Sequence, residues 1–127
     1  MKSYTDISQS RVLAKFLPLE SADMYYDDII DSVTGELFIP DDGSTIKIGK
    51  GLGGSIAAWS LAALLDIIPK HIKEYNVLRT DIDEKGFSLW YDEVGYGVND
   101  RLPDITMECP VDACVEMILK LKELKLI

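Results

Sequence analysis

The sequence predicts an α+β fold, with a small antiparallel sheet from two β-hairpins packed by a short buried helix and a longer C-terminal helix. Two pairs of β-prone segments flank turn-forming residues, and the closing segment has the apolar spacing of a helix. The chain has 127 residues, within the usual size of one domain. We therefore expect residues 1–127 to form a single globular domain.

The N-terminal segment predicts a short helix from Asp6 to Phe16. Thr5 or Asp6 can cap its first turn, and Pro18 ends it because proline cannot continue a helix. A second helical turn is expected around residues 21–26.

Acidic residues follow this first helix and are interleaved with tyrosines. Such a pattern is typical of a solvated helical face. It also fits a face that binds a protein partner, with the aromatic side chains as anchors. The candidate partner-binding residues are Asp23, Tyr25, Tyr26 and Asp27.

The first hairpin is expected where Glu36–Ile39 and Thr45–Ile48 flank a turn that contains Pro40 and Gly43. Proline fixes φ for such a turn, and glycine tolerates a positive φ. A glycine loop over residues 49–55 follows this hairpin.

Within that loop, Gly49, Gly51 and Gly54 match the spacing of a dinucleotide-binding fingerprint. Glycines there would let a pyrophosphate approach a helix N-terminus. The preceding segment 45–48 alternates polar and apolar residues, whereas the strand of a dinucleotide-binding fold is apolar throughout. The pattern favours a surface loop without a cofactor, and nucleotide binding is kept as an alternative.

The next helix is expected to have Ser60 as its N-cap and to stop before Pro69. Its apolar side chains point nearly all round the axis, so we expect a buried helix. These side chains are Leu61, Leu64, Leu65, Ile67 and Ile68.

The second hairpin is expected from segments 75–82 and 87–91, with a turn at 83–86 in which Gly86 takes a positive φ. Asp81 and Asp83, with Asp92, partly match the spacing of a calcium-binding loop. Lys85 stands where an oxygen ligand belongs, and the flanking segments are strands. We therefore expect a turn here and no metal site, with Asp81 and Asp83 as the weak candidate ligands.

The last helix is expected to begin at Pro110, a residue that suits the first helical position. Glu116 and Lys120 are spaced to form an i,i+4 ion pair. Apolar residues on this helix extend beyond one stripe, which indicates either deep burial or a contact surface. The additional apolar residues are Leu119, Leu124 and Leu126.

Cys109 and Cys114 are too far apart around a helix to form a disulfide, so two free thiols are expected. Cys109 lies near the N-cap, where unpaired backbone N–H groups favour the thiolate, and it should be the more reactive thiol. A catalytic pair of Cys109 with His71 is the alternative to structural roles for both residues. One histidine and two cysteines are too few for an ordinary zinc site.

The net charge is −9 and is spread evenly along the chain. Proteins that bind nucleic acid need a basic surface, so direct binding to nucleic acid is not expected. No segment has the ~18 apolar residues of a membrane-spanning helix, and the first residues contain no secretion signal. We therefore expect a cytoplasmic protein that does not bind membranes.

Three blocks of the sequence resemble short uncharacterised proteins of gut anaerobic bacteria. The blocks are 22–26, 59–65 with the following Pro69, and 110–121. Genes of that kind often lie in prophages or other mobile elements, so the resemblance implies a genomic setting. It implies no activity and no site residues.

No constellation of catalytic side chains stands out. The expected function is that of a non-catalytic accessory or interaction protein, possessing a protein partner or associating with itself. One alternative is an acidic mimic of nucleic acid that inhibits a basic protein. The other is a small nucleotide-binding protein that uses the loop Gly49–Gly54.

Overall fold

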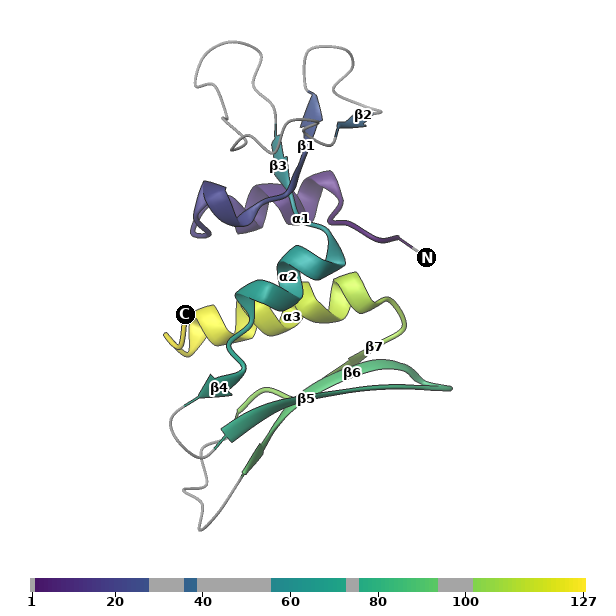
Figure 1. The fold of residues 1–127 in the computed structure, drawn as a ribbon, viewed down its shortest axis with the longest axis vertical. Coiled ribbons are helices and arrows are strands. Elements are labelled where there is room, and N and C mark those ends of the chain that lie inside the picture. Colours follow the sequence, from purple (N-terminus) through teal and green to yellow (C-terminus); the bar gives the residue numbers. More distant parts are fainter. Residues whose placement is uncertain (1, 28–35, 39–55, 73–75, 94–101) are drawn as a thin grey trace. The chain divides into compact units, whose positions relative to one another are not determined.

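The computed structural model describes residues 2–27, 36–38, 56–72, 76–93 and 102–127 (Figure 1). The chain divides into an N-terminal unit, Ser3–Ala63, and a C-terminal unit, Leu64–Ile127 with Met1–Lys2. Each unit contains helical segments and one antiparallel sheet, so the α+β prediction is confirmed. That residues 1–127 form a single domain stays a prediction.

The described elements are α1 (Ile7–Leu13), the 3-10 helix η1 (Leu19–Ser21), β1 (Met24–Asp27), β2 (Glu36–Phe38), β3 (Ile56–Ala58), α2 (Leu61–Ile67), β4 (His71–Ile72), β5 (Asn76–Asp83), β6 (Gly86–Glu93), β7 (Ile105–Met107) and α3 (Pro110–Glu123).

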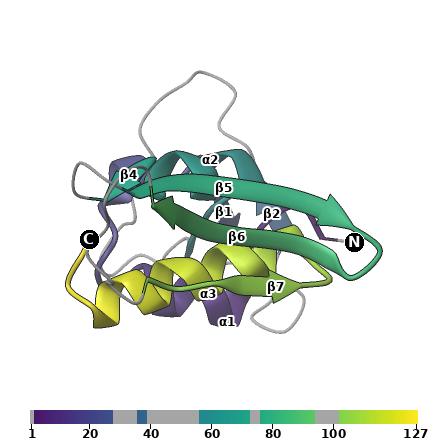
Figure 2. The ribbon, with the colours of Figure 1, turned by 90° about the horizontal axis from the view of Figure 1, so that it is seen from below.

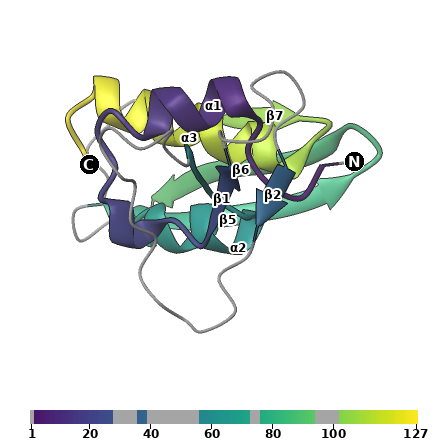
Figure 3. The ribbon, with the colours of Figure 1, turned by 90° about the horizontal axis from the view of Figure 1, so that it is seen from above.

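The N-terminal unit is a three-stranded sheet, in the order β2-β1-β3, with α1 packed against β3. Figure 3 shows β1 and β2 of this sheet next to each other. The central strand β1 pairs on both sides, with Tyr25 opposite Phe38 and also opposite Ala57. The backbone N–H and C=O groups of β1 therefore bond to the neighbouring strands β2 and β3. They are not available for the hydrogen bonds of a helix.

The predicted first helix is present as α1, and Asp6 caps it. The Asp6 carboxylate accepts from the Gln9 backbone N–H at 2.7 Å, and the Gln9 side chain accepts from the Asp6 N–H at 3.1 Å. This capping box satisfies two N–H groups that the first turn leaves unpaired. The regular helix ends at Leu13, earlier than expected, and the carbonyl of Leu13 accepts from the N–H groups of Phe16 and Leu17 in the turn that follows.

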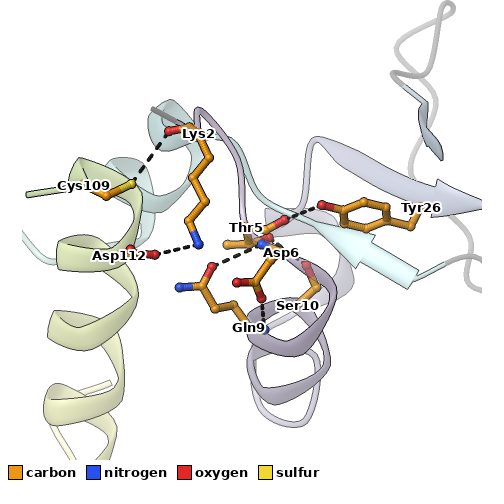
Figure 4. Close-up of polar contacts among 8 residues, drawn as sticks. All are labelled: Lys2, Thr5, Asp6, Gln9, Ser10, Tyr26, Cys109 and Asp112. Carbon is orange, nitrogen blue, oxygen red and sulfur yellow. Dashed lines mark hydrogen bonds and ion pairs between the residues drawn. The ribbon is translucent and has the colours of Figure 1, made fainter. Parts of the chain in front are cut away.

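A buried polar network centred on Thr5 joins three parts of the N-terminal unit (Figure 4). The Thr5 hydroxyl accepts from the Trp59 N–H at 3.1 Å and shares a 2.8 Å hydrogen bond with the Ser10 hydroxyl. The Thr5 N–H donates to the Trp59 carbonyl at 2.9 Å, and the Tyr26 hydroxyl donates to the Thr5 carbonyl at 2.8 Å. Thr5 thereby links α1, β1 and the end of β3 with its polar groups satisfied.

The predicted helical turn at residues 21–26 is wrong. The chain makes the 3-10 turn η1 and then enters β1. Tyrosine favours strands, and pairing on both edges outweighs the weak helical pattern. The apolar segment 56–58 is also a strand, although so short an apolar run has no periodicity that distinguishes a strand from a helix.

The first predicted hairpin is described only in part. Glu36–Phe38 forms β2 and pairs with β1. The second predicted segment, Thr45–Ile48, and its turn lie outside the described residues.

The predicted cap of α2 is confirmed. The Ser60 hydroxyl accepts from the Ala63 N–H at 3.2 Å, and the Asp23 carboxylate accepts from the Ser60 N–H at 2.9 Å. The helix is buried on one side instead of all round. Leu64 is fully buried, whereas Ala62 and Asp66 are exposed.

The C-terminal unit is a four-stranded antiparallel sheet in the order β4-β5-β6-β7. The predicted second hairpin is confirmed as β5 and β6, in continuous register from Asn76–Glu93 to Asp83–Gly86. The helix α3 lies along one face of β6 and β7, and Figure 2 shows the opposite face of this sheet toward the viewer. Phe87, Leu89 and Ile105 are buried on the face that α3 covers.

The turn between β5 and β6 depends on Gly86, whose φ is +125°. A Cβ atom at this position would lie 2.4 Å from the Met107 carbonyl oxygen. The Asp83 carboxylate accepts from the Lys85 N–H at 2.8 Å, a local bond that favours the turn. The predicted positive φ of Gly86 is confirmed, and the close approach of β7 gives it a second reason.

The start of α3 matches its prediction, with Pro110 at the first helical position and Cys109 at the N-cap. The Lys2 ammonium lies 2.7 Å from the Asp112 carboxylate, in the first turn of the helix (Figure 4). Glu116 and Lys120 form the predicted ion pair at 3.9 Å. Most of the wide apolar arc is buried, although Leu124 beyond the helix is exposed.

None of the described helices is both long and apolar enough to cross a membrane.

Candidate functional site at the end of the β5–β6 hairpin

A row of three apolar side chains crosses the sheet of the C-terminal unit beside the β5–β6 turn. Ile82 on β5 stands opposite Phe87 on β6, and Phe87 stands opposite Met107 on β7. Phe87 is 7% exposed, whereas Ile82 and Met107 are 75% and 37% exposed. We call these three residues the apolar row. A buried aromatic ring is thus flanked by two apolar side chains in contact with solvent.

A hollow of about 370 Å³ lies next to the apolar row, between the β5–β6 turn and the start of α3. Its lining carries three carboxylates, one ammonium group and one thiol. The lining residues are Asp83, Glu84, Lys85, Gly86, Glu108 and Cys109.

The thiol in this hollow is that of Cys109, which is half-buried at the N-cap of α3. Its side chain makes no capping hydrogen bond, and its sulfur lies 3.9 Å from the Lys2 carbonyl oxygen as a weak donor. The predicted absence of a disulfide is confirmed, because Cys109 and Cys114 are both free.

The other face of the hairpin is polar. Asp92 accepts from the Trp90 indole N–H at 3.0 Å, and its second oxygen lies 3.4 Å from Arg79 Nε. Ser88 and Thr106 share a 2.9 Å hydrogen bond between β6 and β7. Asp81 and Asp83 lie on this face too, since their register partners Ser88 and Gly86 alternate with Phe87. This face is therefore polar, while the α3 side is apolar.

The predicted partner-binding residues fall on or beside β1 in the N-terminal unit. Tyr26 is buried and donates to Thr5, and Asp23 holds the N-cap of α2. Tyr25 is half-buried, and the backbone of Asp27 pairs with Glu36. Asp23 and Tyr26 therefore have structural roles, which leaves less of this cluster available as an anchor.

The calcium-like spacing does not bring its carboxylates together. Asp81 and Asp83 lie near the turn, whereas Asp92 stands opposite Val77, six residues along β5 from Asp83. A strand rises about 3.3 Å per residue, which places Asp92 roughly 20 Å from the turn. Among the described residues, no three His, Cys, Asp or Glu side chains are grouped to hold a metal ion.

The considered pair of Cys109 and His71 is separated in the same way. His71 stands opposite Val77 at the far end of β5, and Cys109 lies at the hollow beside the turn. The strand geometry again gives a separation of roughly 20 Å, too far for proton transfer between the two side chains. The glycines of the nucleotide candidate, Gly49, Gly51 and Gly54, lie outside the described residues.

Two ionisable groups of the C-terminal unit are held in their neutral forms. Burial raises the pKa of the Cys114 thiol from 9.0 to about 12, although the nearby charge of Lys70 opposes this shift. Burial also raises the pKa of Tyr91 to about 12, and its hydroxyl donates to the Pro69 carbonyl at 2.7 Å. Both groups belong to the packing around α3 and β6 and not to the hollow.

The apolar row was not predicted from the sequence, because β7 was not recognised as a strand. The alternation of Ile105, Thr106 and Met107 is the period-two pattern of a strand and could have revealed it. The sequence does not predict that Ile82 is exposed. Its register partner Phe87 lies on the same face of the sheet and is buried, so alternation alone would predict burial for both.

Comparisons with protein-family models, with curated proteins and with solved structures give no significant match to this chain.

Proposed function

We propose that this chain is a non-catalytic interaction protein that binds a protein partner through the end of its β5–β6 hairpin. The observation that supports this most is the apolar row, in which Ile82 and Met107 remain exposed beside the buried Phe87. Contiguous apolar surface with a polar rim is typical of sites where proteins associate. The carboxylates that line the hollow supply a polar border on one side of such a site.

The arrangement of reactive side chains supports a binding role over a catalytic one. The hollow contains a thiol, but the histidine that could serve as its base lies at the other end of the sheet. The resemblance of the blocks 59–65 and 110–121 to small proteins of mobile elements fits an accessory role. On that ground we also propose that a mobile element encodes this chain.

A capture experiment tests this function. The tagged full chain is incubated with extract of the producing cells, and bound proteins are identified by mass spectrometry and then purified for calorimetry. We expect a stoichiometric partner that is lost when Ile82→Lys and Met107→Lys are combined, because lysine ammonium groups would have to be desolvated at the contact.

The matched control combines Val12→Lys with Leu124→Lys. Those side chains are 38% and 49% exposed, so the same change in charge is made at apolar positions outside the apolar row. Loss of the partner in both double variants, or a protein that remains monomeric and binds nothing, would count against the proposal.

A further inference from the structure

The free edge of β5 beside the apolar row is the feature from which a partner class can be inferred. The strand has eight residues, but β4 pairs only with Asn76 and Val77. Among the described strands, none pairs with residues 79–83 on that side. Within the part of the chain that the structure describes, residues 79–83 thus present a strand edge to which another strand can add.

The direction of the backbone groups along this edge follows from one hydrogen bond. The Leu78 N–H donates to the Lys70 carbonyl at 2.8 Å, on the β4 side of the strand. Successive residues of a strand direct their N–H and C=O groups to opposite edges. The N–H and C=O groups of Thr80 and Ile82 therefore point to the free edge, and those of Asp81 and Asp83 point to β6.

A second copy of this chain fits the edge poorly. With Thr80 opposite Ile82 of the other copy, Asp81 would stand opposite the other Asp81. With the two Ile82 residues opposite each other, Asp81 would face Asp83 of the other copy. With the two Thr80 residues opposite each other, Ile82 would face Leu78. The N–H of Leu78 already donates to the Lys70 carbonyl, so it could not pair with the other copy. Like charges directly opposite each other destabilise a strand pair.

A basic strand fits the same edge well. Asp81 and Asp83 are exposed on the polar face, and Ile82 between them is exposed on the apolar face. An added strand with the pattern basic–apolar–basic would place two cations beside the carboxylates and one apolar side chain beside Ile82. This pattern is the same in either strand direction. Arg79 on the same strand does not oppose it, because Arg79 is paired with Asp92.

From this complementarity we infer that the protein binds an extended segment with alternating basic and apolar residues, which adds as a strand to the free edge of β5. The inference rests on the proposed function and specifies the partner of the same site. The bonding groups would be the backbone of Thr80 and Ile82, and the selecting groups would be Asp81, Asp83 and Ile82.

The test uses the full chain and capped heptapeptides of alternating lysine and valine, or of alternating glutamate and valine. Amide hydrogen exchange is followed by NMR. At ten times the dissociation constant, the lysine peptide should slow exchange at Thr80 and Ile82 about tenfold. Exchange at Asp81, whose N–H already bonds to β6, should change little. The glutamate peptide should have no effect.

Two variants sharpen the test. Thr80→Pro removes an outward N–H that β6 does not use, so the sheet should form while peptide binding is lost. Asp81→Lys should weaken the lysine peptide about fivefold, as expected for exposed charge pairs. Asp66→Lys makes the same change of charge at an exposed position on α2, outside the strand that would bind the peptide, and should leave binding unchanged.

Equal binding of both peptides, or binding without protection of Thr80 and Ile82, would overturn strand addition at this edge. So would a dimer in sedimentation analysis whose contact protects the same two amides. If neither peptide binds while the apolar-row variant still loses its captured partner, the strand inference fails and the proposed function stands. If that variant also keeps its partner, both fail.

Discussion

Ile82 and Phe87 stand directly opposite each other across the β5–β6 ladder, yet Ile82 is 75% exposed and Phe87 only 7%. The difference arises because α3 packs on β6 and β7, and β5 lies toward the other side of the sheet. Two apolar residues of one register pair thus have different roles, Phe87 in the core and Ile82 at the surface.

Stability measurements should separate these roles. Phe87→Ala should lower the free energy of unfolding by about 3–5 kcal/mol, because it leaves a cavity under α3. Ile82→Ala should cost no more than about 1 kcal/mol, the range of strand preferences at an exposed site. Urea unfolding monitored by circular dichroism measures both values. Similar losses for the two variants would show that Ile82 belongs to the core.

Gly86→Ala should disrupt the hairpin turn. A methyl group would meet the Met107 carbonyl oxygen, and φ of +125° is strained for alanine. We expect a loss of at least about 2 kcal/mol in the free energy of unfolding. The control is Lys85→Ala at the exposed neighbouring position. A Gly86→Ala protein as stable as this control would refute the role of the close approach.

The Thr5 network should show energetic coupling. Thr5→Val removes the partner of both the Trp59 N–H and the Ser10 hydroxyl, which should cost about 1–3 kcal/mol. Ser10→Ala should cost about 1 kcal/mol. A double-mutant cycle with both changes should give a coupling energy of at least about 0.5 kcal/mol.

Ser8→Ala serves as the control in the same helix, because Ser8 is exposed. Thr5→Val and Ser10→Ala effects that simply add would indicate that the hydroxyl–hydroxyl bond contributes nothing to stability.

The two thiols should react at different rates. Cys109 is half-buried beside the hollow, whereas Cys114 is fully buried and its raised pKa of about 12 keeps it protonated at neutral pH. We expect Cys109 to react with a disulfide reagent at least about tenfold faster. The variants Cys109→Ser and Cys114→Ser show which thiol gives the fast and which the slow phase of the reaction. Equal, slow labelling of both thiols would contradict this expectation.

Stability should fall in alkaline solution. The unfolded chain loses the Cys114 proton near pH 9, while the folded protein keeps it up to about pH 12. Between these values the unfolded state binds fewer protons, so the free energy of unfolding decreases, by up to about 1.4 kcal/mol per pH unit. Below pH 9 both the folded and the unfolded state keep the Cys114 proton, so this thiol causes no loss of stability there. Tyr91 adds a decrease of the same sign from pH 10 to about pH 12.

The free energy of unfolding is measured with denaturant at several pH values, from pH 8 to the highest pH at which the protein stays folded. Cys114→Ala should flatten the slope above pH 9, even though the cavity lowers stability at every pH. An unchanged slope in this variant would show that the thiol is not the group responsible.

The sequence by itself determined the elements that depend on local chemistry. Asp6 and Gln9 form a capping box, Ser60 caps α2, Pro110 begins α3, and Gly86 allows the second hairpin turn. Each of these features is decided by hydrogen bonds, ring geometry or φ within a few residues. Local physics therefore suffices for them.

Only the tertiary structure decided the rest. Residues 24–27 and 56–58 are strands because they pair with each other across the sheet, although their sequences carry a weak or ambiguous local signal. Ile82 is exposed and Tyr26 buried because of what packs on each strand, which alternation within one segment cannot specify. The candidate site was unpredictable for the same reason, since β5, β6 and β7 form the apolar row only after they pair.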